Sequence, residues 1–126
     1  MKAQPEYQLQ VAVCDYLRRQ YPKVMFMSDT IAAVKLTMGQ ARRNKAVQKE
    51  GFKTPDLIIF EPGRDGSVLF IELKAESPFK KDGTLKANPH VEAQAATGVE
   101  LTARGYGFFL AWTFEQAKAI IDGHLK

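Results

Sequence analysis

Apolar and polar residues follow two periods along this chain, one typical of helices and one typical of strands. Pro5 suits a first helical turn, and apolar residues recur at helical spacing after it until Tyr21 and Pro22 interrupt the pattern. This repeat consists of Leu9, Ala12, Val13, Tyr16 and Leu17. Residues 24–27 are a short apolar run. The pattern therefore predicts an N-terminal helix followed by a short strand.

The middle of the chain predicts a second helix and a hairpin. Residues 36–50 permit a helix with few apolar positions, and Gly51 is a plausible C-terminal stop. Residues 56–60 and 68–74 are strand-like runs, and the connection between them, residues 61–67, is dense in turn residues. An antiparallel hairpin is the simplest interpretation.

The remaining third predicts two helices on either side of a strand. Pro89 can open a helix that ends near Gly105, and residues 108–112 predict a buried strand. Thr113 can cap a last amphipathic helix. In the helix that Pro89 opens, one face holds Val91, Gln94, Ala95, Gly98, Leu101 and Thr102. In the last helix, the apolar face holds Ala117, Ile120, Ile121 and Leu125. The predicted order is α-β-α-β-β-α-β-α, an α/β domain.

Composition narrows the class of protein. A length of 126 residues with 45% hydrophobic content predicts one domain spanning residues 1–126. Eighteen lysines and arginines against 14 acids give a net charge of +4, which is compatible with a polyanionic partner. The single cysteine, Cys14, excludes an internal disulfide, and no apolar run approaches the ~18 residues that span a bilayer. No signal segment is visible, so we expect a cytoplasmic protein.

One acidic residue stands inside an apolar strand and needs a physical reason. Side chains two residues apart share one face of a strand, so Glu72 and Lys74 point to the same side as Phe70. A solvent-exposed pair with Lys74 is one explanation, and a divalent cation shared with Asp56 is the other. Two carboxylates ~4 Å apart repel by about 4 kcal/mol at a surface-like dielectric, which favours a cation or a proton between them.

Five sequence features together resemble the PD-(D/E)xK nuclease superfamily, and more closely its VRR-NUC family, over nearly the whole chain. They are Glu6 in the first helix, Pro55-Asp56, Glu72-Leu73-Lys74, Gln94 in the third helix, and Arg104-Gly105-Tyr106. One departure is visible, because such domains often place a glycine just before the Pro-Asp pair, whereas this chain has Gly51-Phe52-Lys53-Thr54 there. The resemblance implies a restriction-endonuclease-like core with a mixed central β-sheet flanked by helices.

The resemblance also implies a function, a divalent-metal-dependent DNA endonuclease. It implies that Mg²⁺ or Mn²⁺ is held by Asp56, Glu72, the Leu73 carbonyl and Glu6, with Lys74 and Gln94 in catalytic roles. Lys74 could activate the attacking water or stabilise the phosphate charge, and both roles stay open. Small members of the family act on branched DNA, including four-way junctions, as homodimers, which leads us to expect a homodimer, a phage origin and the host cytoplasm.

Two of these residues have simpler explanations. A glutamate at position 6 is stabilised by the helix dipole, by about 0.3–1 kcal/mol, without any catalytic duty. The Gln94 amide lies on an apolar helix face, so we expect it to find a partner, either within the site or as a backbone cap elsewhere. The histidines at 90 and 124 are isolated from cysteines and from each other, and no phosphate-binding loop motif is present.

Basic residues gather in two places, and both predict contact with DNA phosphates. The first is the segment from Lys35 to Lys53, which contains Lys35, Arg42, Arg43, Lys45, Lys49 and Lys53. The second, weaker group is Lys80, Lys81 and Lys86. Solubility alone would explain such charges. A non-catalytic nucleic-acid-binding module is therefore the alternative to an enzyme.

Overall fold

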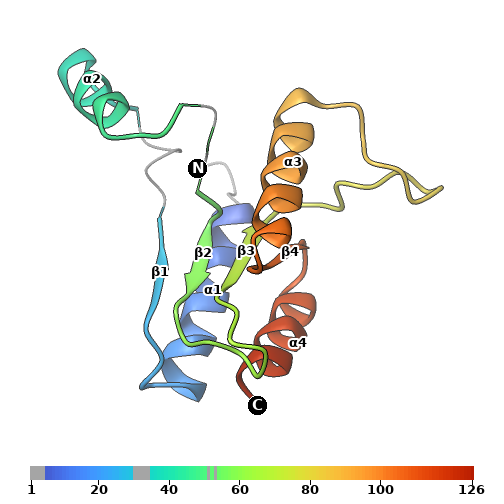
Figure 1. Cartoon of the computed structure of the whole chain (residues 1–126). Helices are drawn as coiled ribbons and strands as arrows, with labels where there is room; N and C mark the ends of the chain where they lie inside the picture. Colours follow the sequence, from blue (N-terminus) through green and yellow to red (C-terminus); the bar gives the residue numbers. More distant parts are fainter. Residues whose placement is uncertain (1–4, 30–34, 51, 53) are drawn as a thin grey trace.

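The computed structural model of the protein has, in the residues that it describes, four helices and four strands in the order expected from the sequence (Figure 1). The structure describes residues 5–29, 35–50, 52 and 54–126. The helices are α1 (Pro5–Gln20), α2 (Met38–Ala46), α3 (Pro89–Ala103) and α4 (Phe114–Leu125). The strands are β1 (Phe26–Ser28), β2 (Leu57–Ile59), β3 (Leu69–Leu73) and β4 (Gly107–Ala111).

The four strands form one mixed sheet in the order β1-β2-β3-β4. The pairs β1/β2 and β2/β3 are antiparallel, so the predicted hairpin is confirmed, with Leu57 opposite Ile71. Strand β4 runs parallel to β3, and α3 makes the crossover between them. The predicted α/β fold with a mixed sheet is confirmed.

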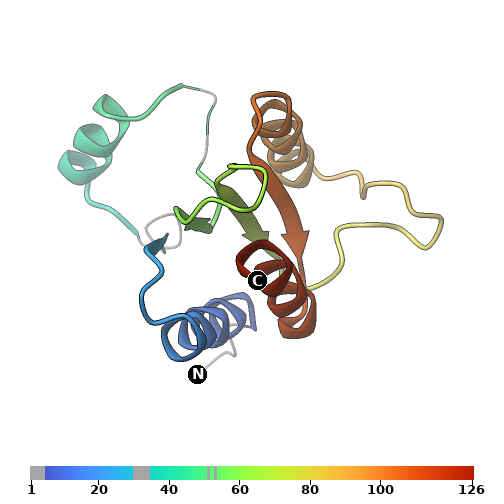
Figure 2. The same cartoon turned by 60° about the horizontal axis from the view of Figure 1, so that its bottom comes forward.

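The hydrophobic core lies between one face of the sheet and the helix pair α1 and α4 (Figure 2). Alternate residues of the strands face this layer, as period-two geometry requires, and they are almost completely buried. They are Leu57, Ile59, Leu69, Ile71, Leu73 and Ala111, and they pack with Val13, Leu17, Ala117 and Ile121 of the two helices. A polar contact joins the same helices, because the hydroxyls of Tyr16 and Tyr21 donate to Asp122 at 2.5 and 2.6 Å.

Helix α3 covers the opposite face of the sheet, on the side of β4. Its close approach depends on Gly98, because a Cβ at that position would lie 2.3 Å from the ring of Phe108. The helix begins where the Asn88 side chain accepts from the backbone N–H groups of His90 and Val91, and Pro89 occupies its first turn as predicted. No helix of the described residues packs on the part of this face over β1 and β2 (Figure 1).

Two predicted elements differ from those observed. The helix expected over residues 36–50 is shorter, since α2 begins at Met38 and ends at Ala46. None of its residues is buried, so it lacks the tertiary packing that stabilises longer helices. Its expected stop, Gly51, and the predicted phosphate contact Lys53 lie outside the described residues. Strand β4 is not fully buried as expected, because it lies at the sheet edge and the Phe109 side chain is 48% exposed. Among the described residues, no helix combines the length and apolar character needed to cross a bilayer.

Candidate active site

Asp56 and Glu72 lie across from each other on neighbouring strands. Extending the β2/β3 register by one residue beyond Leu57 and Ile71 places Asp56 opposite Glu72, and directly opposed side chains on one face have Cβ atoms about 4.5–5.5 Å apart. Glu72 is only 6% exposed. The explanation of Glu72 as half of a solvated surface pair is therefore wrong, and the two acids lie together as the second explanation required.

The surroundings of Glu72 favour its protonated form. Burial of the Glu72 carboxyl raises its pKa far above the ordinary value, and a hydrogen bond to Asp56 and the charge of Asp56 raise it further. The ammonium of Lys74 acts in the opposite direction but more weakly. Glu72 is therefore protonated at neutral pH in the absence of a cation and donates that proton to Asp56.

Hydrogen bonds from two neighbouring strands, β1 and β3, fix Asp56. Its Oδ2 accepts from the backbone N–H of Leu73 at 2.8 Å, and its carbonyl oxygen accepts from the Ser28 hydroxyl at 2.6 Å. Ser28 in turn accepts from the Gln10 side chain of α1 at 2.6 Å. The sequence analysis did not identify Gln10 or Ser28, because one polar residue on a helix or a short strand has no distinctive pattern.

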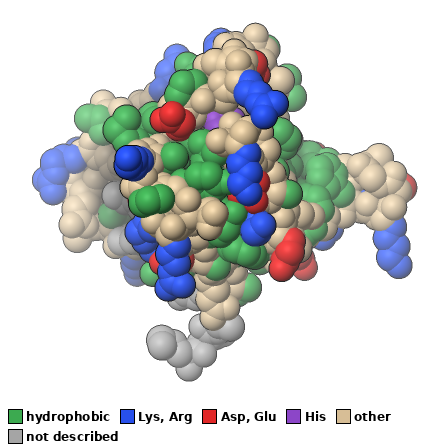
Figure 3. All heavy atoms as spheres, turned by 90° about the horizontal axis from the view of Figure 1, so that it is seen from below, with side chains coloured by type: hydrophobic (Ala, Val, Ile, Leu, Met, Phe, Trp, Pro, Cys, Tyr) green, Lys and Arg blue, Asp and Glu red, His purple; other side chains and the backbone are tan. Residues whose placement is uncertain are grey.

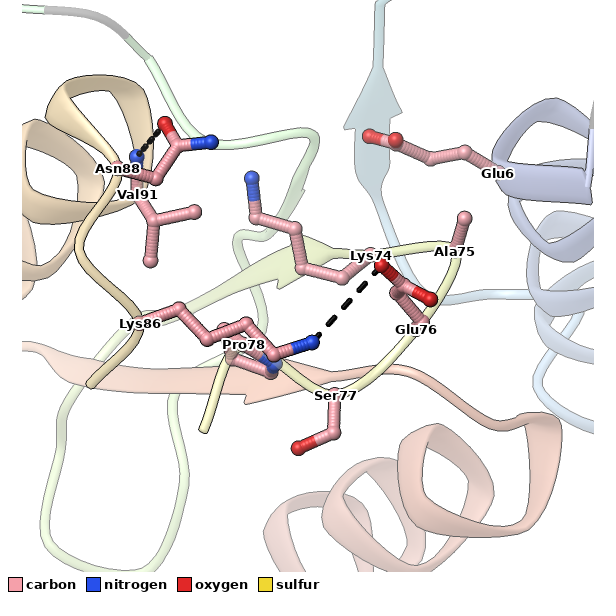
Figure 4. Close-up of a pocket in the computed structure, with 9 residues that line it drawn as sticks. All are labelled: Glu6, Lys74, Ala75, Glu76, Ser77, Pro78, Lys86, Asn88 and Val91. Carbon is pink, nitrogen blue, oxygen red and sulfur yellow. Dashed lines mark hydrogen bonds and ion pairs between the residues drawn. The ribbon is translucent and has the colours of Figure 1, made fainter. Parts of the chain in front are cut away.

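A cavity of about 200 Å³ is lined by Glu6 and Lys74, whereas neither Asp56 nor Glu72 is among its lining residues (Figure 4). Glu6 enters it from α1, and Lys74 enters it from the end of β3. Burial and the negative charge of Asp56 raise the pKa of Glu6, while Lys74 lowers it, so Glu6 lies within electrostatic reach of both. The other residues that line the cavity are Ala75, Glu76, Ser77, Pro78, Lys86, Asn88 and Val91. The structure thus brings Glu6, Asp56, Glu72 and Lys74 together.

The predicted catalytic residue Gln94 does not line this cavity. Its Nε2 lies 3.2 Å from Nε2 of His90, one turn earlier on α3, while its Oε1 is buried and has no hydrogen-bond partner among the described residues. A buried amide oxygen without a partner costs about 1–3 kcal/mol, so a bound water or substrate group would stabilise it. Arg104 pairs with Glu100, and Tyr106 packs edge-on against Phe70 at 5.3 Å.

The predicted DNA-contacting residues are exposed and occupy two projecting parts of the molecule. Lys35 precedes α2, which carries Arg42, Arg43 and Lys45 and stands apart from the sheet (Figure 1). Lys80 and Lys81 lie in the loop between β3 and α3, which extends from the opposite side of the sheet and has basic side chains at its far end (Figure 3). The candidate active site lies between these two basic parts.

The donor atoms of the site suit a divalent cation with oxygen ligands. Mg²⁺ and Mn²⁺ prefer carboxylate and carbonyl oxygens, and the raised pKa of Glu72 marks the place where a cation would relieve the repulsion from Asp56. Among the described residues, however, no three acidic, histidine or cysteine side chains lie close enough to form a complete metal site. The acidic pair alone therefore offers two carboxylates as candidate ligands.

The mixed sheet, the helix pair behind it and the acidic pair with a lysine at the end of β3 define a restriction-endonuclease-like α/β fold. Two solved structures share it. One, named "VRR_NUC domain protein", has a TM-score of 0.65 and 24% identity over 99% of this chain and 91% of its own. The other, named "VRR_NUC domain", has a TM-score of 0.56 and 18% identity over 98% of this chain and its own full length. No family profile and no curated protein sequence matches this chain. The protein therefore has the VRR-NUC fold, as the sequence resemblance implied.

Proposed function

We propose that this protein is a member of the VRR-NUC family and a divalent-metal-dependent DNA endonuclease. The observation that carries the proposal is the pair formed by the buried Glu72 and the half-buried Asp56, held opposite each other beside Lys74 in a VRR-NUC fold. Two carboxylates held this close, one of them buried, cost a fold stability, so a functional role would explain their presence. Binding a hard cation at a phosphodiester is the role that these residue types fit.

Asp56 and Glu72 are the proposed carboxylate ligands for Mg²⁺ or Mn²⁺. A bound ion would polarise the phosphoryl oxygens and offset the charge on the leaving oxygen. The Leu73 carbonyl fits as a further ligand, because the N–H and C=O of one strand residue face the same neighbour and its N–H already binds Asp56. Glu6, on the far side of the cavity, would join the proposed set through a bound water.

Lys74 is the proposed residue at the reacting phosphate. Its backbone N–H donates to the Ala111 carbonyl at 2.8 Å, which fixes the end of β3 against β4 and holds the side chain in the cavity. There its ammonium can stabilise the charge on the phosphate or orient the attacking water. The buried Oε1 of Gln94 is the acceptor through which that residue would hold a water near the site.

The DNA backbone is the proposed ligand of the two basic parts. Lys35, Arg42, Arg43 and Lys45 would contact phosphates on one side of the site, and Lys80 and Lys81 on the other. Basic surfaces on both sides of a single cavity suit a branched substrate such as a four-way junction, in which DNA arms leave the cleavage point in different directions.

A homodimer is the proposed assembly. Its support is the sheet face over β1 and β2, where no helix of the described residues packs (Figure 1). Three large apolar side chains in or next to these two strands are exposed: Met25, Met27 and Phe60. A second copy seated on this face would bury them and present two sites to one junction. Light scattering at working concentration should give the mass of two chains, and a single-chain mass would contradict the dimer.

A cleavage assay tests the activity. Labelled four-way junction, flap and linear duplex DNA are incubated with Mg²⁺, Mn²⁺ or EDTA, using the unaltered protein, Lys74→Ala and the matched control Lys23→Ala, which lies in the exposed turn after α1. We expect metal-dependent cuts that are lost with EDTA and with Lys74→Ala only. Salt-sensitive binding without any cleavage would instead favour the non-catalytic nucleic-acid-binding module.

A further inference from the structure

Lys86 differs from the other lysines of the loop between β3 and α3. Lys80 and Lys81 lie exposed toward the tip of this loop, whereas Lys86 is half-buried and lines the same cavity as Lys74 (Figure 4). The two lysines reach the cavity from different segments, Lys74 from the end of β3 and Lys86 from the residues just before α3. The cavity is therefore lined by a second lysine side chain in addition to the lysine of the Glu72-Leu73-Lys74 motif.

The base of the loop is built so that Lys86 stays in this place. The Lys86 backbone N–H donates to the carbonyl of the buried Pro78 at 2.9 Å, and Phe79 pairs with Leu85 across the loop. The ring of Phe79 packs edge-on against Trp112, just after β4, with ring centres 5.7 Å apart. The Phe79–Trp112 contact holds the first half of the loop against the end of β4, and the Phe79–Leu85 bridge holds the second half against the first. The backbone that carries Lys86 is therefore anchored.

The counter-ion of Lys86 is a weak one. Lys86 Nζ lies 3.8 Å from Oε1 of Glu76, at the outer limit of an ion pair, and the Glu76 side chain is 86% exposed. Exposed pairs of this kind contribute little to stability, so they exchange readily for a better anion. A phosphate oxygen that enters the cavity would offer Lys86 a shorter, charge-assisted hydrogen bond.

We propose that Lys86 is a phosphate-binding residue of this cavity, and that Glu76 is a resting counter-ion which the DNA backbone displaces. The phosphate is the one that flanks the phosphate at Lys74, because both ammonium groups open into one cavity while coming from separate segments. Lys86 would therefore hold the strand in register and leave the reacting phosphate to Lys74. The inference rests on the proposed function, since it takes DNA as the ligand.

The test compares Lys86→Met, Lys86→Arg and Glu76→Gln with the unaltered protein and with Lys23→Met, a lysine remote from the cavity. Binding to a fluorescent four-way junction is measured in EDTA over a series of salt concentrations, and KM and kcat are measured with Mn²⁺. We expect Lys86→Met to raise Kd and KM about 10-fold with little change in kcat, and to reduce the slope of log K against log salt by about 0.9, the loss of one phosphate contact. Lys86→Arg should restore binding, and Glu76→Gln should tighten it.

A failure of the Lys86 inference and a failure of the proposed enzyme give different experimental results. If Lys86→Met matches Lys23→Met in affinity and in salt slope while the unaltered protein binds DNA, the inference is overturned and the proposed function is untouched. If the unaltered protein binds DNA but never cuts it, the proposed enzyme is overturned, and the salt slopes still decide the role of Lys86. An effect of Lys86→Met that Lys86→Arg does not restore would also contradict phosphate binding, and equal thermal melting of the variants excludes misfolding as its cause.

Discussion

The carboxylate of Asp56 accepts a 2.8 Å hydrogen bond from the backbone N–H of Leu73, which ties the residue before β2 to the last residue of β3. This bond closes the open end of the hairpin at the place where Glu72 faces Asp56. The acidic pair is therefore part of the sheet's own hydrogen-bonded frame, and its spacing follows from the separation of two strands.

Replacement of Glu72 by glutamine should separate catalysis from stability. The neutral amide copies the protonated carboxyl and can still donate to Asp56, so the free energy of unfolding should change by less than about 1 kcal/mol. Loss of a metal ligand should reduce cleavage at least about 100-fold. Junction cleavage and urea unfolding measure the two quantities. Glu115→Gln, an exposed acid of α4, is the control that should alter neither.

The raised pKa of Glu72 predicts that the metal-free protein loses stability as the pH rises. Above the ordinary glutamate pKa, the unfolded chain has lost a proton that the folded protein keeps, so the stabilisation is complete below that value and declines toward the raised pKa. The slope for one proton is at most about 1.4 kcal/mol per pH unit. Thermal melting in EDTA from pH 5 upward should show the decline.

Two comparisons isolate the contribution of Glu72 to that decline. Glu72→Gln should flatten it, because the amide does not titrate in this range. Excess Mn²⁺ or Mg²⁺ should reverse it, since the cation competes with the proton for the same oxygens and binds better as the pH rises. An equally steep decline in Glu72→Gln would mean that another group is responsible.

Substitutions of two helical glycines should have opposite effects. In Gly98→Ala the new methyl group would clash with the Phe108 ring and force α3 away from β4, which we expect to cost about 1–3 kcal/mol of unfolding free energy. In Gly123→Ala the methyl group meets nothing within 4 Å and should stabilise α4 by up to about 1 kcal/mol. Urea unfolding of both variants tests the packing of α3, and a neutral Gly98→Ala would contradict it.

Neutralisation of α2 should weaken DNA binding without touching the chemistry. A variant with both Arg42→Gln and Arg43→Gln should lose affinity for every DNA shape to a similar degree and reduce the salt slope by about 2. At saturating DNA its rate of cleavage should remain that of the unaltered protein. The control is a variant with both Arg18→Gln and Arg19→Gln, in the last turn of α1, which should bind DNA normally.

The order of elements could be predicted from the sequence because the apolar periods and the helix-starting residues agree with the tertiary packing. Thr113, for example, caps α4 as its place in the sequence indicates. The burial of Glu72 could not be predicted, since a strand with a glutamate and a lysine two residues apart looks the same at a surface. Gln10 and Ser28 could not be identified because their role depends on contacts between elements that are distant in the sequence. Gln10 of α1 donates to Ser28 of β1, and Ser28 donates to the Asp56 carbonyl.

The acidic pair lies on the sheet, whereas the basic groups that would contact DNA lie on α2 and on the loop before α3, both of which project from the core. The candidate active site and the candidate DNA contacts therefore lie in structurally separate parts of the chain. Insertions, deletions or replacements in the projecting parts could change which DNA shapes are accepted while the catalytic frame keeps its geometry. The same division makes the fold a scaffold on which new specificities can be grafted.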